Sequence, residues 1–446
     1  MASPSPSRWA ALREVAGRGS WVVVHRYAGL LTAFFLAISG LTGSIIAFGH
    51  EIDAWLNPTL FDAPARGPLL PLDELERSVE RLNPSLQVTY LAADRVPGHA
   101  AFAYVSPRPA PGGGPVVDPG YNQVFLDQVS GKVLGTRLRG GCCLDREHLV
   151  PFLTRLHYTL YIPGYWGRWL MGGIALVWLF DGLVGLYLTL PRSGPFWERW
   201  KPAWLIKRGG GSYRLNLDLH RAGGLWLWLL FVALATSSIE LNLREEVYKP
   251  AVSAFSPLTP MPMPPPVSPS ISTPISGTSA RPADADAPAG PSFERIRQLA
   301  DAEAVRQGWP RQTTGISHAR ALGLYVAFLR LSHHERGTGL GSPTLYFDAR
   351  DGALLGASVP GKGTAGDVFT QAQFQLHSGQ MAGLPGRILV CLSGLVVTVL
   401  SVTGVVIWLK KRRARALAAA RAAGASSAPP RQSASSTSRS SATNAS

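Results

Sequence analysis

This sequence has little cysteine and few acidic residues, and charge is nearly missing from four long stretches of it. Only three cysteines occur in 446 residues. None belongs to a CxxCH motif, which excludes covalent attachment of a c-type haem. We expect the adjacent Cys142 and Cys143 to form a vicinal disulfide and Cys391 to pack among apolar side chains.

The four stretches that lack charge are each long enough to cross a membrane. A transmembrane helix needs about 20 apolar residues to cross about 30 Å of hydrocarbon. Asp181 is the one formal charge that lies inside these stretches and not near an end. We place the four predicted transmembrane α-helices at residues 22–48, 168–190, 221–240 and 386–409.

Positive charge decides the predicted orientation. Nineteen of the 43 Lys and Arg lie in the N-terminal flank, the loop after the second span and the tail, where Glu14, Glu198 and Asp218 are the only acids. The positive-inside rule therefore predicts that both termini are cytoplasmic, and it accounts for the net charge of +15 without nucleic acid as a partner. The predicted cytoplasmic segments are 1–21, 191–220 and the disordered tail 410–446.

The segments on the other side of the membrane carry strand and turn patterns. Residues 49–167 and 293–385 are each predicted to form a small α+β domain, and a Pro-rich linker over 241–292 precedes the second. The matched phrases VFLDQVSGKVLG from Val124 and LYFDARDGALLG from Leu345 predict hairpins. Because both halves enter and leave the membrane in the same sense, they form two parallel repeats related by a pseudo-two-fold axis.

Four of the ten histidines occupy equivalent places in these repeats. His25 and His220 stand at the cytoplasmic ends of the first and third spans, and His157 and His377 stand outside, before the second and fourth. The pseudo-two-fold axis brings His25 toward His220 and His157 toward His377. Two facing imidazoles at membrane depth suit a bis-His haem, so we predict two non-covalent b-type haems with these iron ligands.

Neighbouring residues complete the predicted sites. Four arginines are expected to pair with haem propionates: Arg26 and Arg221 on the cytoplasmic side, and Arg168 and Arg387 outside. His50 is a reserve ligand for the outer site. Asp181 is either a proton-handling group or a carboxylate hydrogen-bonded to a Trp, Tyr or Thr of a neighbouring helix.

Other interpretations of these residues stay open. Histidine at a membrane boundary is often only interfacial, and arginine at the end of a span often serves only to set topology. Zinc is the competing metal, although histidine-only pairs with no carboxylate at matching spacing suit tetrahedral zinc less well than haem.

The chain resembles the PepSY-associated transmembrane family, iron-regulated inner-membrane proteins of which some members reduce ferric siderophores. The resemblance runs from about Ser20 to Arg413 and rests on phrases such as HRYAGLLTAFFLAISGLTGSIIAF, LHSGQMAGLPGRIL and SVTGVVIWLKKRR. It implies a four-helix di-haem protein of the bacterial inner membrane with two PepSY-like periplasmic domains. Its histidines carry over onto the four named above. The third span departs from the pattern, because ALATSSIEL lacks the LTG phrase of the others.

The predicted function is transmembrane electron transfer that reduces a ferric siderophore, or another ferric chelate, in the periplasm. The electron donor is a quinol or a cytoplasmic flavoprotein. One-electron reduction releases iron because oxygen-rich chelators bind Fe(III) far more tightly than the larger, softer Fe(II). Two other functions stay open: a siderophore transporter or accessory protein without redox activity, and a PepSY-type regulator of envelope peptidases.

Overall fold

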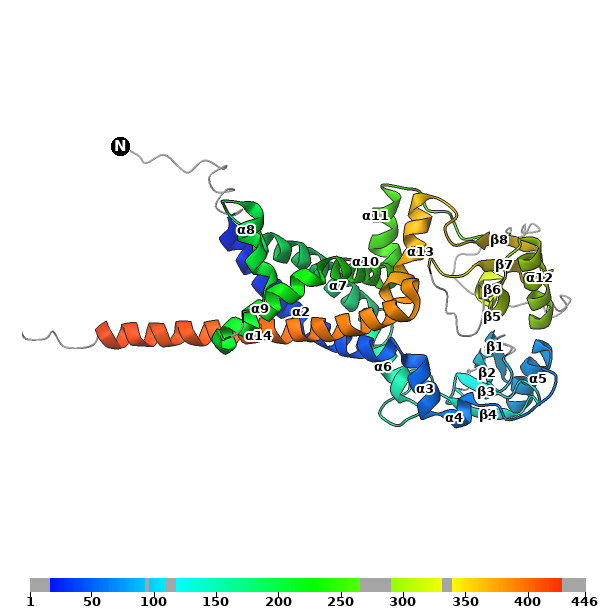
Figure 1. Ribbon diagram of the computed structural model, residues 1–446. Helices are drawn as coiled ribbons and strands as arrows, with labels where there is room; N and C mark the ends of the chain where they lie inside the picture. Colours follow the sequence, from blue (N-terminus) through cyan, green and yellow to red (C-terminus); the bar gives the residue numbers. More distant parts are fainter. Residues whose placement is uncertain are drawn as a thin grey trace, which may run out of the picture.

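The computed structural model describes residues 17–92, 96–109, 118–207, 209–264, 290–330 and 339–426. A bundle of long helices stands at one end of the molecule and a β-sheet at the other (Figure 1). We call these ends the termini side, where the first and last described helices begin and end, and the sheet side. Parts of the predicted N-terminal segment 1–21, the linker 241–292 and the tail 410–446 lie outside the described residues. The described part of the tail, predicted to be disordered, is helical as far as Ser426, because its Ala, Arg and Leu residues are strong helix formers.

Four segments of the chain form the bundle. They are α2 (Arg18–Ile46), α7 (Trp166–Thr189), the pair α9 (Gly211–Trp226) and α10 (Trp228–Asn242), and α14 (Gly383–Ser426). The helices α2, α7 and α14 are long and apolar enough to cross a membrane, with mean hydropathies of 1.9, 1.8 and 2.4 in their most apolar parts. The pair α9 and α10 makes a fourth span if the two are counted as one.

This third segment along the chain is bent. The axes of α9 and α10 differ by 69° across Leu227. Gly223 and Gly224 lie one turn earlier, and a glycine pair weakens a helix against kinking. Beyond the bend, the Trp228 indole N–H donates to the Gly182 carbonyl of α7 at 2.9 Å. The structure therefore differs from the uninterrupted helix predicted over 221–240, because hydropathy reports length and polarity and not the direction of the axis.

The helices α2 and α14 cross where both carry small residues. A Cβ added to Gly40 would collide with the Gly394 carbonyl, and one added to Gly394 would collide with Gly40. Ser44 Oγ donates to the Cys391 carbonyl at 2.7 Å, so Cys391 contributes its backbone to the contact. Spans that pack through small residues bring their backbones this close, which fixes α2 against α14.

All eight strands of the described chain belong to one antiparallel sheet, in the order β4-β3-β2-β1-β5-β6-β7-β8. The first half of the chain supplies β1 (Leu86–Ala92), β2 (Ala101–Pro107), β3 (Gln123–Leu126) and β4 (Val133–Arg137). The second half supplies β5 (Gln312–Ala319), β6 (Leu324–Arg330), β7 (Thr344–Asp348) and β8 (Leu354–Ser358).

The two halves of the sheet meet at β1 and β5. Leu91 pairs with Ile316 at this seam, and both residues are fully buried. The two α+β domains that the sequence predicts are thus joined into one continuous sheet with a common core. The sequence does not reveal this junction, because hydrogen bonding between strands of distant segments leaves no local pattern.

One helix from each half covers the same face of the sheet. These are α5 (Leu72–Leu82) and α12 (Phe293–Arg306), whose apolar side chains join the sheet core. The N-terminus of each helix is capped by a carboxylate of the other helix. Asp73 accepts from the Glu294 N–H at 2.9 Å, and Glu294 accepts from the Leu72 N–H at 3.0 Å. Negative charge at a helix N-terminus satisfies otherwise unpaired N–H groups, so these contacts tie the two halves together.

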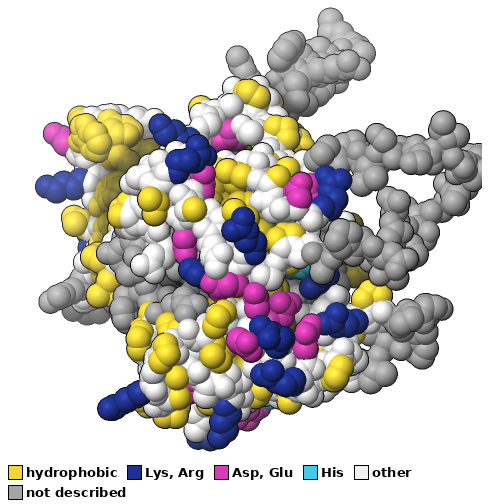
Figure 2. Space-filling view, turned by 90° about the vertical axis from the view of Figure 1, so that its right-hand side faces the viewer, with side chains coloured by type: hydrophobic (Ala, Val, Ile, Leu, Met, Phe, Trp, Pro, Cys, Tyr) yellow, Lys and Arg dark blue, Asp and Glu magenta, His cyan; other side chains and the backbone are white. Residues whose placement is uncertain are grey.

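Charged side chains gather across the middle of this helix-covered face (Figure 2). On α5, burial, with Glu80 nearby, raises the pKa of Glu76 to about 7. His318 of β5 is partly buried and stacks on Tyr325, with ring centroids 3.9 Å apart. Burial, with Arg320 nearby, lowers the pKa of His318 to about 3.

Shorter helices connect the sheet to the bundle. They are α3 (Gly49–Leu56), α4 (Pro58–Phe61), α6 (Leu149–Thr159), α11 (Lys249–Ser253) and α13 (Ala365–His377), with a π-helical turn at Arg244–Tyr248 and a 3-10 turn at Gln380–Ala382. On the termini side, α8 (Phe196–Trp200) and a 3-10 turn at Lys201–Trp204 lie between α7 and α9, and a 3-10 turn at Arg320–Leu322 joins β5 to β6. The first part of the predicted linker is thus helical as far as Ser253. The helix α6 packs against α2 and α13 packs against α10, which places the ends of both beside the bundle.

Candidate cofactor sites

The structure brings the four predicted histidines together in the predicted pairs. His25 of α2 faces His220 of α9, with ring centroids 6.1 Å apart. His157 near the end of α6 faces His377 at the end of α13, with ring centroids 6.0 Å apart. We call these the termini-side pair and the sheet-side pair. Each pair takes one histidine from each half of the chain.

Two of the histidines use Nδ1 to donate to a backbone carbonyl of a spanning helix. His220 Nδ1 donates to the Leu400 carbonyl of α14 and His157 Nδ1 to the Ser39 carbonyl of α2, both at 3.0 Å. A carbonyl only accepts, so the proton of the neutral imidazole sits on Nδ1. Nε2 then keeps a lone pair that is available to a metal.

The other two histidines reach the same state through side chains. His377 Nδ1 lies 3.0 Å from Ser237 Oγ of α10, and that hydroxyl donates its own proton to the Leu234 carbonyl. The hydroxyl therefore accepts from the ring. His25 Nδ1 lies 2.9 Å from Asp181 Oδ1 of α7. In all four residues Nδ1 is engaged by a neighbouring helix, as in metal-ligating histidines whose orientation is fixed from behind.

The four contacts follow one spacing along the spanning helices. The first residue supplies the acceptor of the Nδ1 proton or, for His377, the carbonyl that holds the accepting hydroxyl. A second residue on the same helix face follows three positions later, and a small residue follows four positions later. We call each set of three a histidine seat. The seats are Ser39, Thr42 and Gly43 for His157; Leu400, Thr403 and Gly404 for His220; Leu234, Ser237 and Ser238 for His377; and Asp181, Val184 and Gly185 for His25.

The small residue of a seat makes room for the imidazole. A Cβ added to Gly43 would lie 2.9 Å from His157 Cε1, and one added to Gly404 or Gly185 would lie 3.3 or 3.4 Å from the Cε1 of His220 or His25. In the sequence, the small residue of a seat appears within a recurrent LTG-like phrase. The sequence does not show that this phrase packs against a histidine from another helix. The third span, which departs from that phrase, has Ser237 and Ser238 in the seat.

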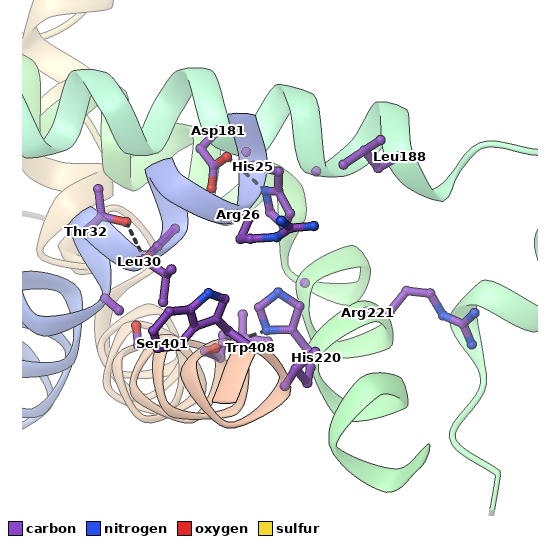
Figure 3. A pocket seen from close by; sticks show the side chains of 18 of the residues that line it. His25, Arg26, Leu30, Thr32, Asp181, Leu188, His220, Arg221, Ser401 and Trp408 are labelled. Carbon is purple, nitrogen blue, oxygen red and sulfur yellow. Dashed lines mark hydrogen bonds and ion pairs between the residues drawn. The ribbon is translucent and has the colours of Figure 1, made fainter. Parts of the chain in front are cut away.

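A cavity of about 670 Å³ accompanies the termini-side pair. Figure 3 shows His25 and His220 on opposite sides of the open space, with Trp408 beside His220. Apolar side chains make up much of the wall, among them Leu36, Trp178, Phe231, Val397 and Leu400. The volume is within the roughly 300 to 1,000 Å³ of small-molecule and cofactor sites.

The spacing within each pair fits two imidazoles on one metal ion. A bond from a metal to an imidazole nitrogen is about 2 Å, and the ring centre is roughly 1 Å farther, so two opposed imidazoles have centroids roughly 6 Å apart. The observed separations are 6.1 and 6.0 Å. Within the described residues no group of three or more His, Cys, Asp and Glu side chains is placed so that it could hold a metal ion. Each pair offers two imidazoles as protein ligands.

The two arginines predicted for the termini side, Arg26 and Arg221, both line the cavity, but the guanidinium of Arg221 is bonded to other protein groups. The Arg221 guanidinium donates to Asp218 at 2.8 Å, and Figure 3 shows it directed away from the histidines. Three cations that the sequence analysis did not single out also line the cavity: Lys411, Arg412 and Arg415 of α14. The sequence signal for them is the KKRRAR run, which reads first as a topology determinant.

Both arginines predicted for the sheet side are hydrogen-bonded to other groups of the protein. Arg168 donates to the Leu241 carbonyl at 3.2 Å. Arg387 donates to the Ala47 carbonyl at 2.9 Å and to Glu51 at 2.8 Å. These contacts join α7 to α10 and α14 to the end of α2, so the two arginines brace the bundle at that level.

Two further predictions concern Asp181 and His50. Asp181 contacts His25, and not the Trp, Tyr or Thr that one of its two predicted roles requires, because α2 and α7 pack with these two residues face to face. His50 lies on α3 in an edge-to-face contact with Phe61, with ring centroids 5.7 Å apart. The ring that faces His157 is His377.

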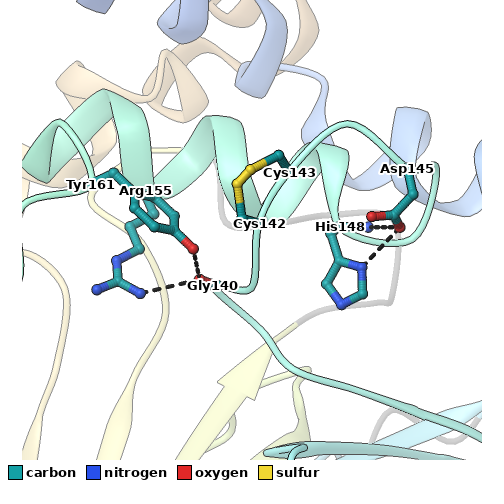
Figure 4. The surroundings of a disulfide bond; sticks show 7 residues. All are labelled: Gly140, Cys142, Cys143, Asp145, His148, Arg155 and Tyr161. Carbon is teal, nitrogen blue, oxygen red and sulfur yellow. Dashed lines mark hydrogen bonds and ion pairs between the residues drawn. A yellow bond between two sulfur atoms is a disulfide. The ribbon is translucent and has the colours of Figure 1, made fainter.

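The predicted vicinal disulfide joins Cys142 and Cys143 in the loop before α6 (Figure 4). Two residues of α6 and its C-terminal turn hold this loop. Tyr161 Oη donates to the Gly140 carbonyl at 2.6 Å, and Arg155 donates to the same carbonyl at 3.1 Å. The loop is thereby fixed to the helix that carries His157.

Comparison with known proteins identifies one family. The model described as the PepSY-associated TM region matches residues 22–411, which is most of the chain. No curated protein matches the sequence. The matched range includes all four paired histidines and all four histidine seats.

Proposed function

Because the chain belongs to the family of PepSY-associated transmembrane proteins, we propose that it is a di-haem electron-transfer protein of the bacterial inner membrane. It reduces a ferric siderophore or another ferric chelate in the periplasm. The observation that carries the proposal is the repetition of one ligand geometry. Two imidazole pairs, each with Nδ1 held from behind and centroids 6.1 or 6.0 Å apart, lie at different levels of an apolar bundle.

The basic segments support the orientation in this proposal. Lys410, Lys411, Arg412 and Arg413 follow the last apolar stretch, and positive residues collect on the cytoplasmic side of membrane proteins. The termini-side pair is then cytoplasmic and the sheet-side pair periplasmic. A quinol or a cytoplasmic flavoprotein supplies electrons at the first pair, and the ferric chelate takes them near the second.

The protein's own residues supply position, charge and exclusion of water. The seats engage Nδ1 of each imidazole, which leaves the lone pair of Nε2 available to a metal. Arg26, Arg412 and Arg415 provide positive charge for the carboxylates of a macrocycle in the termini-side cavity. A haem supplies a reversible one-electron carrier. Delivery of one electron to the chelate converts Fe(III) to Fe(II), which oxygen-rich chelators hold less tightly, so iron is released.

An optical spectrum of detergent-purified protein, oxidised and then reduced with dithionite, tests the first part of the proposal. We expect a Soret band and two non-covalent haems per chain. Anaerobic stopped-flow mixing of the reduced protein with ferric siderophores tests the second part, and we expect reoxidation with Fe(II) trapped by an added chelator. If haem is present but no chelate accelerates reoxidation over buffer, the reductase function is wrong. A protein without haem leaves the transporter or accessory function in its place.

A further inference from the structure

One of the four histidine seats differs chemically from the other three. The seats of His157, His220 and His377 combine a backbone carbonyl with a hydroxyl, from Thr42, Thr403 and Ser237. The seat of His25 has the carboxylate of Asp181, and Val184 stands where the others have the hydroxyl.

The repeat identifies the counterpart of Asp181 directly. Asp181 stands thirteen residues after Arg168, and Leu400 stands thirteen residues after Arg387. Val184 corresponds to Thr403 in the same way. One half of the protein therefore has a charged seat at the position where the other half has a neutral one.

The carboxylate of Asp181 is directed at His25. Its side chain is 10% exposed, Oδ1 lies 2.9 Å from His25 Nδ1, and among the described residues His25 is its only ion-pair partner. The second oxygen lies beside Gly29, where a Cβ would be in ordinary contact at 3.8 Å from Asp181 Oδ2. No Lys or Arg of the described chain forms an ion pair that would neutralise the charge.

A carboxylate behind a metal-bound imidazole has a known physical effect. It draws the Nδ1 proton toward itself and makes the imidazole a stronger electron donor to the metal. A negative charge in an apolar bundle also stabilises the more positive, oxidised state of a nearby metal, because the local dielectric is low. Carbonyls and hydroxyls do both to a smaller extent, since they carry no net charge.

We infer that Asp181 is a positioning residue that makes the termini-side haem the more reducing of the two. It thereby sets electron flow from the termini side toward the sheet side. The inference rests on the proposed function, since it requires haem at both pairs. It adds a role for one residue that distinguishes two sites of otherwise repeated design.

Redox titration of the full-length protein in detergent tests this role. In Asp181→Asn we expect the termini-side potential to rise by about 59 mV, a tenfold shift of the electron distribution between the haems. The sheet-side potential should stay unchanged. A His377→Ala background, which retains only the termini-side haem, assigns the shift to that site.

A rebuilt seat separates charge from position. The double variant Asp181→Leu/Val184→Thr copies the Leu400 and Thr403 seat, so His25 keeps a carbonyl and a hydroxyl as partners. We expect it to bind haem and to show the same rise in potential. The opposite exchange, Leu400→Asp/Thr403→Val, should lower the termini-side potential. Gly173→Ala, which adds a Cβ with nothing within 4 Å, is the control and should leave the termini-side potential unchanged.

Three results would overturn the inference in different ways. Haem retained with unchanged termini-side potential in both Asp181 variants would show that the charge does not tune the site, while the proposed function stands. Loss of the termini-side haem from both variants would assign Asp181 a purely structural role. A wild-type protein without haem would remove the proposed function and this inference together.

Discussion

The termini-side and sheet-side pairs have the same ring separation but different surroundings. The termini-side pair borders a cavity of about 670 Å³ and has a carboxylate behind one ring, and its His25 side chain is 33% exposed. The sheet-side pair is held only by carbonyls and hydroxyls, between helices that come from the membrane bundle and from the connections to the sheet. The two halves of the chain thus place their histidines at the same separation, while single residues around each pair differ in charge and exposure.

The two pairs also share structural elements. The helix α2 carries His25 of one pair and the seat of His157 of the other. A disturbance of α2 along its length should therefore affect both sites, whereas removal of one histidine should affect one. This difference can be tested by substitutions of decreasing effect.

The largest effect is expected from removing a ligand. His25→Ala or His220→Ala should remove the termini-side haem and leave the sheet-side haem, and His157→Ala or His377→Ala should do the reverse, because each iron loses one of two protein ligands. Haem quantification per chain measures this. His148→Ala, which removes a histidine paired with Asp145 before α6, is the control and should keep both haems. A full haem complement in all four variants would contradict the assignment.

A substitution at the crossing of α2 and α14 should weaken both sites together. In Gly40→Ala the new Cβ meets the Gly394 carbonyl, so the helices must separate. We expect a loss of about 1–3 kcal/mol of stability, the usual cost of overpacking, and reduced retention of both haems. Thermal unfolding in detergent, followed at the Soret band, measures this. Gly173→Ala on α7 adds a Cβ with nothing within 4 Å and should be neutral.

Filling one seat should distinguish the pairs more finely. In Gly43→Ala the Cβ would lie 2.9 Å from His157, closer than the 3.3 and 3.4 Å expected for Gly404→Ala and Gly185→Ala. We expect Gly43→Ala to lower the affinity for the sheet-side haem by about tenfold, or 1.4 kcal/mol. The other two substitutions should lower the affinity for the termini-side haem by less. Haem transfer to an acceptor protein measures retention. Equal effects of all three, or an effect of Gly182→Ala, would contradict the seat geometry.

The smallest effect concerns the seam of the sheet, far from either pair. Burial, with Glu80 nearby, raises the pKa of Glu76 from 4.5 to about 7, so the folded state prefers the protonated carboxyl. Stability should therefore fall as the pH rises from about 4.5 to about 7, and the full loss should persist above that. We expect a decrease of about 2–4 °C in melting temperature for each kcal/mol lost.

Glu76→Gln should remove this pH dependence, and Glu74→Gln on the same helix should retain it. Circular dichroism of the full chain at several pH values measures the slope. The haem spectra should not change over the same range, because the seam is separated from both pairs by the connecting helices. A rise in stability with pH in this window would contradict the predicted sign.

Several features could be predicted from local patterns. The apolar stretches within Arg18–Ile46, Trp166–Thr189 and Gly383–Ser426 follow from the cost of exposing charge to hydrocarbon, which acts residue by residue. The pairing of the histidines followed from the repeat, because equivalent residues of two similar halves meet near a shared axis. The two matched phrases predicted hairpins because each has turn residues between two strand patterns, which act locally.

Other features depend on contacts between distant segments. The junction of β1 with β5 and the contact of Asp181 with His25 join segments that are far apart in the sequence and show no local pattern of their contact. The direction of the helix axis beyond the bend at Leu227 also has no local pattern. The sequence by itself therefore determined which residues enter the membrane and which histidines are equivalent. Only the tertiary structure decided which neighbour each Nδ1 meets, because a hydrogen bond depends on the packing of two helices within a few tenths of an ångström.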